Sequence, residues 1–165
     1  MRGDATLLLC YEAETTDRLE FGPSVSRSSW GTDFLVPLIG GELRYAVNSD
    51  GTIPSDTPAI TYPTDSYFGD VLRRSNRAFS TSDIKTNSFC TTAFSSGILE
   101  MVARGLGVAW APFSMAYREL ETGKLVSLAQ SLGKVPLDVA VYGDTKSQLS
   151  ISLLDLWSNG AKKRN

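Results

Sequence analysis

Short apolar runs alternate with amphipathic stretches of helical spacing along most of this chain. The first run, Ala5–Tyr11, is short and continuous, as in a strand that is covered on both faces. A later stretch, by contrast, places Ile98, Leu99, Val102 and Leu106 on one face of a helix. Strands that alternate with helices predict an α/β fold with mostly parallel sheets.

The same patterns locate the remaining elements. Strands are predicted at Val25–Trp30, Phe34–Ile39, Glu42–Val47, Ala59–Tyr62, Ile84–Cys90, Gly107–Ala111, Lys124–Leu128 and Leu137–Tyr142. Other helix faces are predicted from Phe68, Val71, Leu72, Ser75 and Phe79, from Phe113, Ala116, Tyr117 and Leu120, and from Leu149, Leu153, Leu156 and Trp157. Gly31-Thr32-Asp33 is interpreted as a turn, and Gly105 as a left-handed helix stop.

Composition excludes several classes of function. The 165 residues include no histidine, which removes Ser-His and Cys-His nucleophiles and histidine-ligated metals. Sixteen Lys and Arg against 18 Asp and Glu leave a net charge of -2, which argues against nucleic-acid binding by this chain itself. No apolar run approaches the roughly 20 residues of a membrane span.

No cofactor or metal motif stands out. Gly105-Leu106-Gly107 lacks the third glycine and the following helix of a dinucleotide fingerprint, so we expect no cofactor. The acidic residues Glu12, Glu14, Asp17 and Glu20 are irregularly spaced and are interpreted as a solvated face rather than an acid/base pair. We therefore expect no catalytic site and no metal site.

The two cysteines leave one enzymatic alternative open. Cys10 and Cys90 lie in apolar runs without a Cys-x-x-Cys spacing, which favours reduced, buried thiols in a cytoplasmic protein. The alternative is a thiol enzyme that uses one of them as a nucleophile. Without histidine, such a thiolate would depend on Lys, Arg or a helix start for its activation.

Two polar segments point to ligand binding. Tyr62–Ser66 and Thr91–Ser96 each join the end of a predicted strand to the start of a predicted helix. Ligands of open α/β sheets collect beyond the carboxyl ends of strands, where helix amides and hydroxyls converge. Either these residues only cap their helices, or they also line a cleft for a small anionic or polar ligand.

Several motifs resemble one family. Val102-Ala103-Arg104-Gly105-Leu106-Gly107-Val108-Ala109-Trp110-Ala111-Pro112 resembles the effector-binding domain of LysR-type transcriptional regulators. Arg2–Leu8, Phe34–Pro37 and Glu119–Val126 resemble it at the corresponding places, so the likeness spans essentially the whole chain. Tyr62–Gly69 is similar to the hypochlorite-responsive subgroup of that family.

The resemblance implies a fold. It is an α/β, type 2 periplasmic-binding-protein-like fold of two lobes, with the second lobe complete and the first truncated at its N-terminal side. Residues 1–11 and 136–165 would be the remnant of the first lobe, and 12–135 the second lobe with crossing segments near Glu12–Gly22 and Gln130–Pro136. Ala5–Cys10 and Leu137–Tyr142 would then lack neighbours, and we expect self-association through them.

The resemblance also implies a function, namely an effector-sensing regulatory domain without catalytic activity. Its expected ligand-binding residues are Tyr11, Thr64, Asp65, Ser66, Thr92, Phe94 and Ser95. The expected partners are a small-molecule effector and further copies of the chain, most simply in a dimer. DNA would be bound only through an N-terminal domain that is absent here, no membrane is involved, and the location is cytoplasmic. The alternative is a solute-binding protein of a transporter, which shares the fold but predicts a secretion signal and a complete first lobe.

Overall fold

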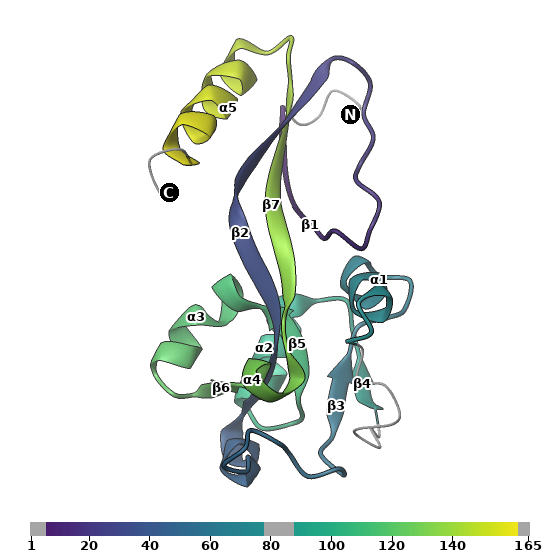
Figure 1. Cartoon of the computed structure of the whole chain (residues 1–165), viewed down its shortest axis with the longest axis vertical. Helices are drawn as coiled ribbons and strands as arrows, with labels where there is room; N and C mark the ends of the chain where they lie inside the picture. The colour runs from purple at the N-terminus through teal and green to yellow at the C-terminus, as the bar shows by residue number, and fades with distance from the viewer. Residues whose placement is uncertain (1–5, 78–87, 162–165) are drawn as a thin grey trace. The chain divides into compact units, whose positions relative to one another are not determined.

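The chain forms two compact units. The computed structural model describes residues 6–77 and 88–161 (Figure 1). Unit 1 comprises Met1–Asp33 and Pro136–Asn165, and unit 2 comprises Phe34–Val135. The later division lies within the predicted segment Gln130–Pro136, whereas the earlier one follows Asp33 rather than lying near Glu12–Gly22.

The division between the two units after Asp33 lies within a single strand. Gly31-Thr32-Asp33 is not a turn but part of one continuous strand, β2 (Val25–Gly40), so the two strands predicted there are one. The side chain of Asp33 accepts a hydrogen bond from the hydroxyl of Tyr11 on β1 at 3.1 Å, which ties this turn-like sequence to a strand two places away in the sheet. Strand β2 therefore contributes residues to both units.

The described part of unit 1 is built on three strands and one helix. Its elements are β1 (Leu7–Glu12), the first part of β2, most of β7 (Val135–Asp144) and α5 (Gln148–Ala161). Strand β7 lies between β1 and β2, and it pairs with β1 antiparallel from Leu7↔Gly143 to Glu12↔Asp138. The Ser150 hydroxyl of α5 donates to the Thr6 carbonyl oxygen at 2.9 Å, which ties the helix to the start of β1.

The two strands that were expected to lack neighbours differ. Leu137, Ala140 and Val141 of β7 are buried, so this strand is covered. Strand β1 instead ends the sheet on one side among the described residues, and Leu9 at its centre is 53% exposed. The expectation of an uncovered edge therefore holds for β1 and is wrong for β7.

Unit 2 combines the second part of β2 with short strands and helices. The elements that follow β2 are the 3-10 helix η1 (Gly41–Ala46), β3 (Ala59–Thr61), α1 (Tyr67–Arg74), β4 (Ser88–Thr91), α2 (Ser95–Ala103), β5 (Ala109–Pro112), α3 (Phe113–Glu121), β6 (Leu125–Ser127) and α4 (Ala129–Leu132). The strand predicted at Glu42–Val47 is thus wrong. Gly41 at its start has a φ of +54°, which turns the chain into the 3-10 helix.

The strand pairing is mixed rather than mostly parallel. Strand β2 pairs antiparallel with β5 and with β6, whereas β3 pairs parallel with β4. In unit 1, β7 likewise pairs antiparallel with β1. The parallel arrangement survives where the sequence has a helix between two strands, as α1 lies between β3 and β4.

The predicted helix faces are confirmed for α1 and α2 and are largely wrong for α3 and α5. Val71 and Leu72 of α1 and Ile98 and Val102 of α2 are buried, and Gly105 ends α2 with a φ of +74° as expected. Of the predicted face of α3, Ala116 is buried but Phe113 and Tyr117 are exposed. Leu149 and Leu156 of α5, and Leu106 after α2, are exposed as well.

Another part of the unit 2 core is formed by Ile39, Ala59, Val108 and Leu128. Phe79 and Ile84, which were assigned to a helix face and a strand start, lie outside the described residues.

No helix within residues 6–77 and 88–161 is both long enough and apolar enough to span a bilayer.

Candidate functional site

The two polar loops of unit 2 lie side by side. Strands β3 and β4 are parallel, so their carboxyl ends meet at the same edge, with Thr61 opposite Thr91. Beyond them the Thr92 amide donates to the Thr61 carbonyl oxygen at 3.0 Å, and the side-chain oxygens of Thr61 and Thr91 are 3.1 Å apart. The loop that starts α1 and the loop that starts α2 therefore share one edge of the sheet.

The first loop carries Thr64, Asp65 and Ser66. Thr64 and Asp65 are exposed, whereas Ser66 is the N-cap of α1. Its side-chain oxygen accepts a hydrogen bond from the Gly69 amide at 3.3 Å and donates one to the Pro63 carbonyl oxygen at 2.7 Å. Most of the bonding capacity of the Ser66 hydroxyl thus serves the helix start, as the capping interpretation requires.

Replacing Ser66 with alanine is expected to lower the free energy of unfolding by about 1 kcal/mol, because the Gly69 amide loses its cap. Urea denaturation of the purified chain measures this loss. Ser66→Asp keeps an oxygen at the N-cap and should restore most of it. A Ser66→Ala chain as stable as the parent would show that the cap contributes nothing.

The second loop places Thr92, Phe94 and Ser95 at the start of α2. The Thr92 side-chain oxygen accepts from the Phe94 amide at 3.3 Å, and the hydroxyls of Ser95 and Tyr62 are 2.8 Å apart. Phe94 is 76% exposed and occupies the N-cap position of α2 without a side-chain cap hydrogen bond. The first turn of α2 has no acidic residue, so its electrostatic field favours an anion in front of Thr92 and Ser95.

A cavity of about 240 Å³ lies behind the first loop, within unit 2. Its walls come from β3, the loop after it, α1 and β5. The lining residues are Ile60, Thr61, Tyr62, Thr64, Gly69, Leu72, Arg73 and Trp110. Of the residues expected from the sequence to bind a ligand, it contains only Thr64.

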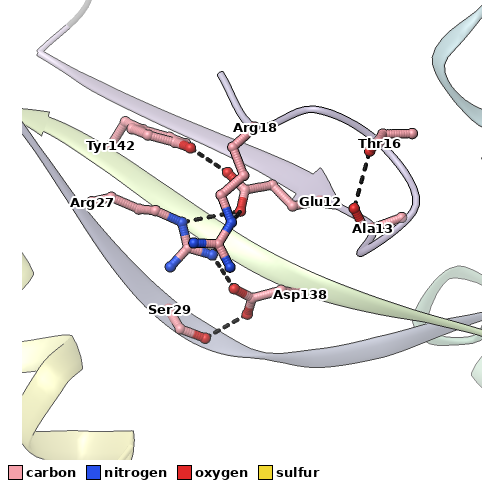
Figure 2. Close-up of polar contacts among 8 residues, drawn as sticks. All are labelled: Glu12, Ala13, Thr16, Arg18, Arg27, Ser29, Asp138 and Tyr142. Atoms are coloured by element: carbon pink, nitrogen blue, oxygen red, sulfur yellow. Dashed lines mark hydrogen bonds and ion pairs between the residues drawn. The ribbon is translucent and has the colours of Figure 1, made fainter. Parts of the chain in front are cut away.

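In unit 1, three strands are joined by a network of charged side chains (Figure 2). Arg27 of β2 donates to Glu12 at the end of β1 through Nε at 3.0 Å and Nη2 at 2.7 Å, and also to Asp138 of β7. Ser29 donates to Asp138, and the Tyr142 hydroxyl donates to Glu12. Glu12 is only 7% exposed, so its interpretation as part of a solvated face is wrong: the carboxylate is buried because Arg27 and Tyr142 satisfy it.

The network shifts the titration of its members. Burial alone would raise the pKa of Glu12, but hydrogen bonds from Arg27 and Tyr142 outweigh it and lower that pKa. Burial and the hydrogen bond to Glu12 raise the pKa of Tyr142 to about 12. The Glu12 contribution to stability is therefore present above the carboxyl's ordinary pKa and is lost as the pH falls through its lowered value.

For Tyr142 the sign is opposite, because the folded state holds the proton to a higher pH than the unfolded chain does. Its contribution is full below about pH 10 and is lost between about pH 10 and about 12. As the pH rises through this range, the free energy of unfolding should therefore fall less for the Tyr142→Phe chain than for the parent. Urea titrations of both chains at each pH measure the difference, and parallel losses would contradict the assignment.

A second cavity, of about 360 Å³, adjoins this network within unit 1. Three carboxylates, Glu12, Glu14 and Asp138, line it together with Arg18. Tyr11, the expected ligand-binding residue of this unit, does not line it, and its hydroxyl donates to Asp33. The carboxylates make this cavity unfavourable for an anion.

Both cysteines are free and partly buried. Burial, and after it the charge of Glu12, raises the pKa of the Cys10 thiol. A raised pKa disfavours the thiolate, which is the opposite of what a catalytic cysteine requires.

Sequence reasoning missed the charge network and most of the unit 2 cavity. The separations of 15 and 111 residues between Arg27 and its two carboxylate partners carry no periodic signal. An arginine within an otherwise uncharged predicted strand, Val25–Trp30, was the one available sign, because a strand arginine requires a carboxylate partner when it is buried.

The fold and the paired loops define a two-unit α/β domain suited to binding small ligands. The family described as the LysR substrate binding domain matches residues 52–158, more than half of the chain. This chain belongs to that family, as its resemblance indicated. None of the curated proteins compared with the chain matches it.

Solved structures of LysR-type regulators share the fold. The apo regulatory domain of HypT from Salmonella typhimurium is 18% identical, with a TM-score of 0.70 over 95% of this chain and 73% of that chain. Full-length HypT from the same organism, described as a hypochlorite-specific LysR-type regulator, is 19% identical, with a TM-score of 0.71 over 95% and 53%. DarR from Vibrio fischeri, solved with DNA, is 16% identical, with a TM-score of 0.73 over 95% and 51%. The expected type 2 periplasmic-binding-protein-like class is thereby confirmed, and the chain spans about half the length of the full-length regulators.

Proposed function

We propose that this chain is the effector-sensing regulatory domain of a LysR-type transcriptional regulator and that it binds a small polar or anionic ligand in unit 2. The observation that carries the proposal is the meeting of the two hydroxyl-rich loops at the carboxyl ends of β3 and β4, bridged by Tyr62 and Ser95. Thr92 and Ser95 would orient the polar group of the ligand beside the amides of α2, and the exposed Phe94 would pack on its body.

The names of two relatives support a small ligand. The regulatory domain of HypT was solved with a bromide ion bound, and LysG from Corynebacterium glutamicum was solved with its effector arginine bound. By analogy, the loops of unit 2 are suited to an anion or to the carboxylate of a small molecule. Thr64 and Asp65 are exposed on the neighbouring loop and would provide further polar contacts.

The test is a titration of the isotope-labelled chain with bromide, phosphate, acetate and arginine, followed by NMR. We expect at least one of these probes to shift the amide resonances of Thr92, Phe94 and Ser95. Ser95→Ala should raise the Kd of that probe about tenfold, because a charge-assisted hydrogen bond is lost. Ser127→Ala is the control, because it removes the hydroxyl of an exposed serine that lies on β6 rather than on either loop. No shift at α2 with any probe would contradict the proposal, and an unchanged Kd for Ser95→Ala would remove Ser95 from the site.

We further propose that the domain acts in the cytoplasm as part of an oligomer, most simply a dimer, and that DNA is bound by another domain of the whole regulator. The exposed edge of β1, with Leu9 at its centre, supports self-association of this chain. A lysine there would oppose edge pairing by charge repulsion and by its need for water.

Light scattering on the full chain is therefore expected to report a species larger than the monomer, and Leu9→Lys is expected to shift it toward the monomer. Leu19→Lys is the control, because Leu19 is similarly exposed but lies outside the strands. Light scattering that reports only the monomer for the parent chain, even at the high concentrations used for NMR, would contradict self-association.

The alternatives have less support. A transporter's solute-binding protein shares the fold, but the family match is to the LysR substrate binding domain. A thiol enzyme would need a lowered cysteine pKa, whereas that of Cys10 is raised.

A further inference from the structure

The unit 2 cavity has an apolar interior. Four buried residues line it, namely Ile60, Tyr62, Leu72 and Trp110. Packing against the rest of unit 2 fixes the positions of these side chains. Two of the four, Tyr62 and Trp110, are aromatic, so the lining suits an apolar or ring-bearing occupant. Its volume of about 240 Å³ lies just below the usual range of small-molecule sites, which limits the occupant to a short or single-ring body.

One cation lies at the border of this apolar interior. Among the described residues that line the cavity, Arg73 of α1 is the one that carries a charge, and Thr61 and Thr64 contribute hydroxyls. The Arg73 side chain is 59% exposed, so its guanidinium lies at the solvent side while the ring-lined part lies deeper.

Arg73 can accept a ligand carboxylate at little cost. It is ion-paired to Asp70, three residues earlier on the same exposed helix face, and such pairs contribute little in water. Asp70 also pairs with Arg74, whose Nε is 2.7 Å from its other carboxylate oxygen. If Arg73 turns to a ligand, Asp70 therefore keeps a cationic partner.

We propose that this cavity selects the effector class, namely a small monocarboxylate with an apolar ring or short alkyl body. The body lies against Tyr62, Leu72 and Trp110, and the carboxylate is held by Arg73 with the Thr64 hydroxyl. Thr92 and Ser95 on the second loop are then left for a separate polar group or a small anion. This inference rests on the proposed function and extends its ligand site inward from the first loop. The carboxylate-lined cavity of unit 1 repels the same ligand, so the two cavities differ in the charge that they accept.

The experiment uses the full chain and four probes. Phenylacetate and hexanoate carry both the charge and the apolar body, phenylacetamide has the body without the charge, and acetate has the charge with almost no body. Calorimetry measures each Kd, and NMR locates each probe through the resonances of Leu72, Arg73 and Trp110. We expect phenylacetate or hexanoate to shift these resonances, and the acid to bind about tenfold more tightly than the amide.

Two arginine variants separate the cavity from general surface charge. Arg73→Gln should raise the Kd of phenylacetate about tenfold and leave the Kd of phenylacetamide unchanged. Arg74→Gln removes the same charge from the same helix and the same Asp70 partner but lies outside the cavity lining, so it should leave both probes unchanged. Circular dichroism of both variants verifies that they fold.

Three results would each overturn the inference. The first is an equal Kd for phenylacetate and phenylacetamide, and the second is an equal effect of Arg73→Gln and Arg74→Gln. The third is the absence of shifts at Leu72, Arg73 and Trp110 with both phenylacetate and hexanoate. If an inorganic anion still shifts Thr92 and Ser95 while the cavity resonances stay fixed, the proposed ligand class fails and the proposed function stands. If no probe shifts either set, both fail.

Discussion

Replacing Arg27 with methionine is expected to lower the free energy of unfolding by about 3–5 kcal/mol. The substitution removes the partner of Glu12, a carboxylate that is 7% exposed and receives two hydrogen bonds from Arg27. It also leaves Asp138 without this cation, which joins β1, β2 and β7. The cost comes from an uncompensated buried charge, and urea denaturation at neutral pH measures it.

Arg18→Met provides the matched control. The Arg18 side chain is 73% exposed, and its Nε lies 3.8 Å from the same Glu12 carboxylate, so its loss should change stability by less than about 0.5 kcal/mol. Adding Glu12→Gln to the Arg27→Met chain removes the unpaired charge and should recover part of the loss. Equal effects of Arg27→Met and Arg18→Met would show that the network does not hold unit 1 together.

Replacing Gly69 with alanine should cost about 3 kcal/mol or more, because a Cβ at this position would lie 1.9 Å from the Pro63 carbonyl oxygen. That oxygen belongs to the backbone, so the loop itself must move. The movement also disturbs the N-cap, since Gly69 donates its amide to Ser66. The helix start that carries the first loop of the candidate site is thus held close to Pro63 by the absence of a side chain.

Gly97→Ala is the control, with the opposite sign expected. A Cβ at Gly97 would meet only the Phe94 Cβ at 3.8 Å, and alanine is the better helix former, so α2 should gain up to about 1 kcal/mol. Urea denaturation of the two variants compares them directly. A Gly69→Ala chain as stable as the parent would contradict the tight packing of this loop.

Two helices, α1 and α2, were predictable from their apolar faces, whereas the faces predicted for α3 and α5 include exposed residues such as Tyr117 and Leu156. The spacing of Val71 and Leu72, and of Ile98 and Val102, identified the buried faces of α1 and α2 because helical periodicity is set by the chain itself. Strand continuity was less predictable. Gly31-Thr32-Asp33 has the composition of a turn, and only a tertiary contact, from Tyr11 to Asp33, shows why it stays extended.

The candidate site likewise has one part that the sequence predicted and one part that it did not. The two loops were predictable because strand-to-helix connections on parallel strands share one edge, and Thr61 and Thr91 do lie opposite each other. The cavity behind the first loop was not predictable, since Trp110 lies far beyond Arg73 in the sequence and no periodic pattern marks the two as neighbours. The network around Glu12 was missed for the same reason.

An NMR map of the whole chain with phenylacetate tests the central claim most directly, because the two cavities differ in charge and lie in different units. The account predicts shifts at Tyr62, Leu72, Arg73 and Trp110. Shifts confined to Glu14, Arg18 and Asp138 would place the ligand in unit 1 and contradict it.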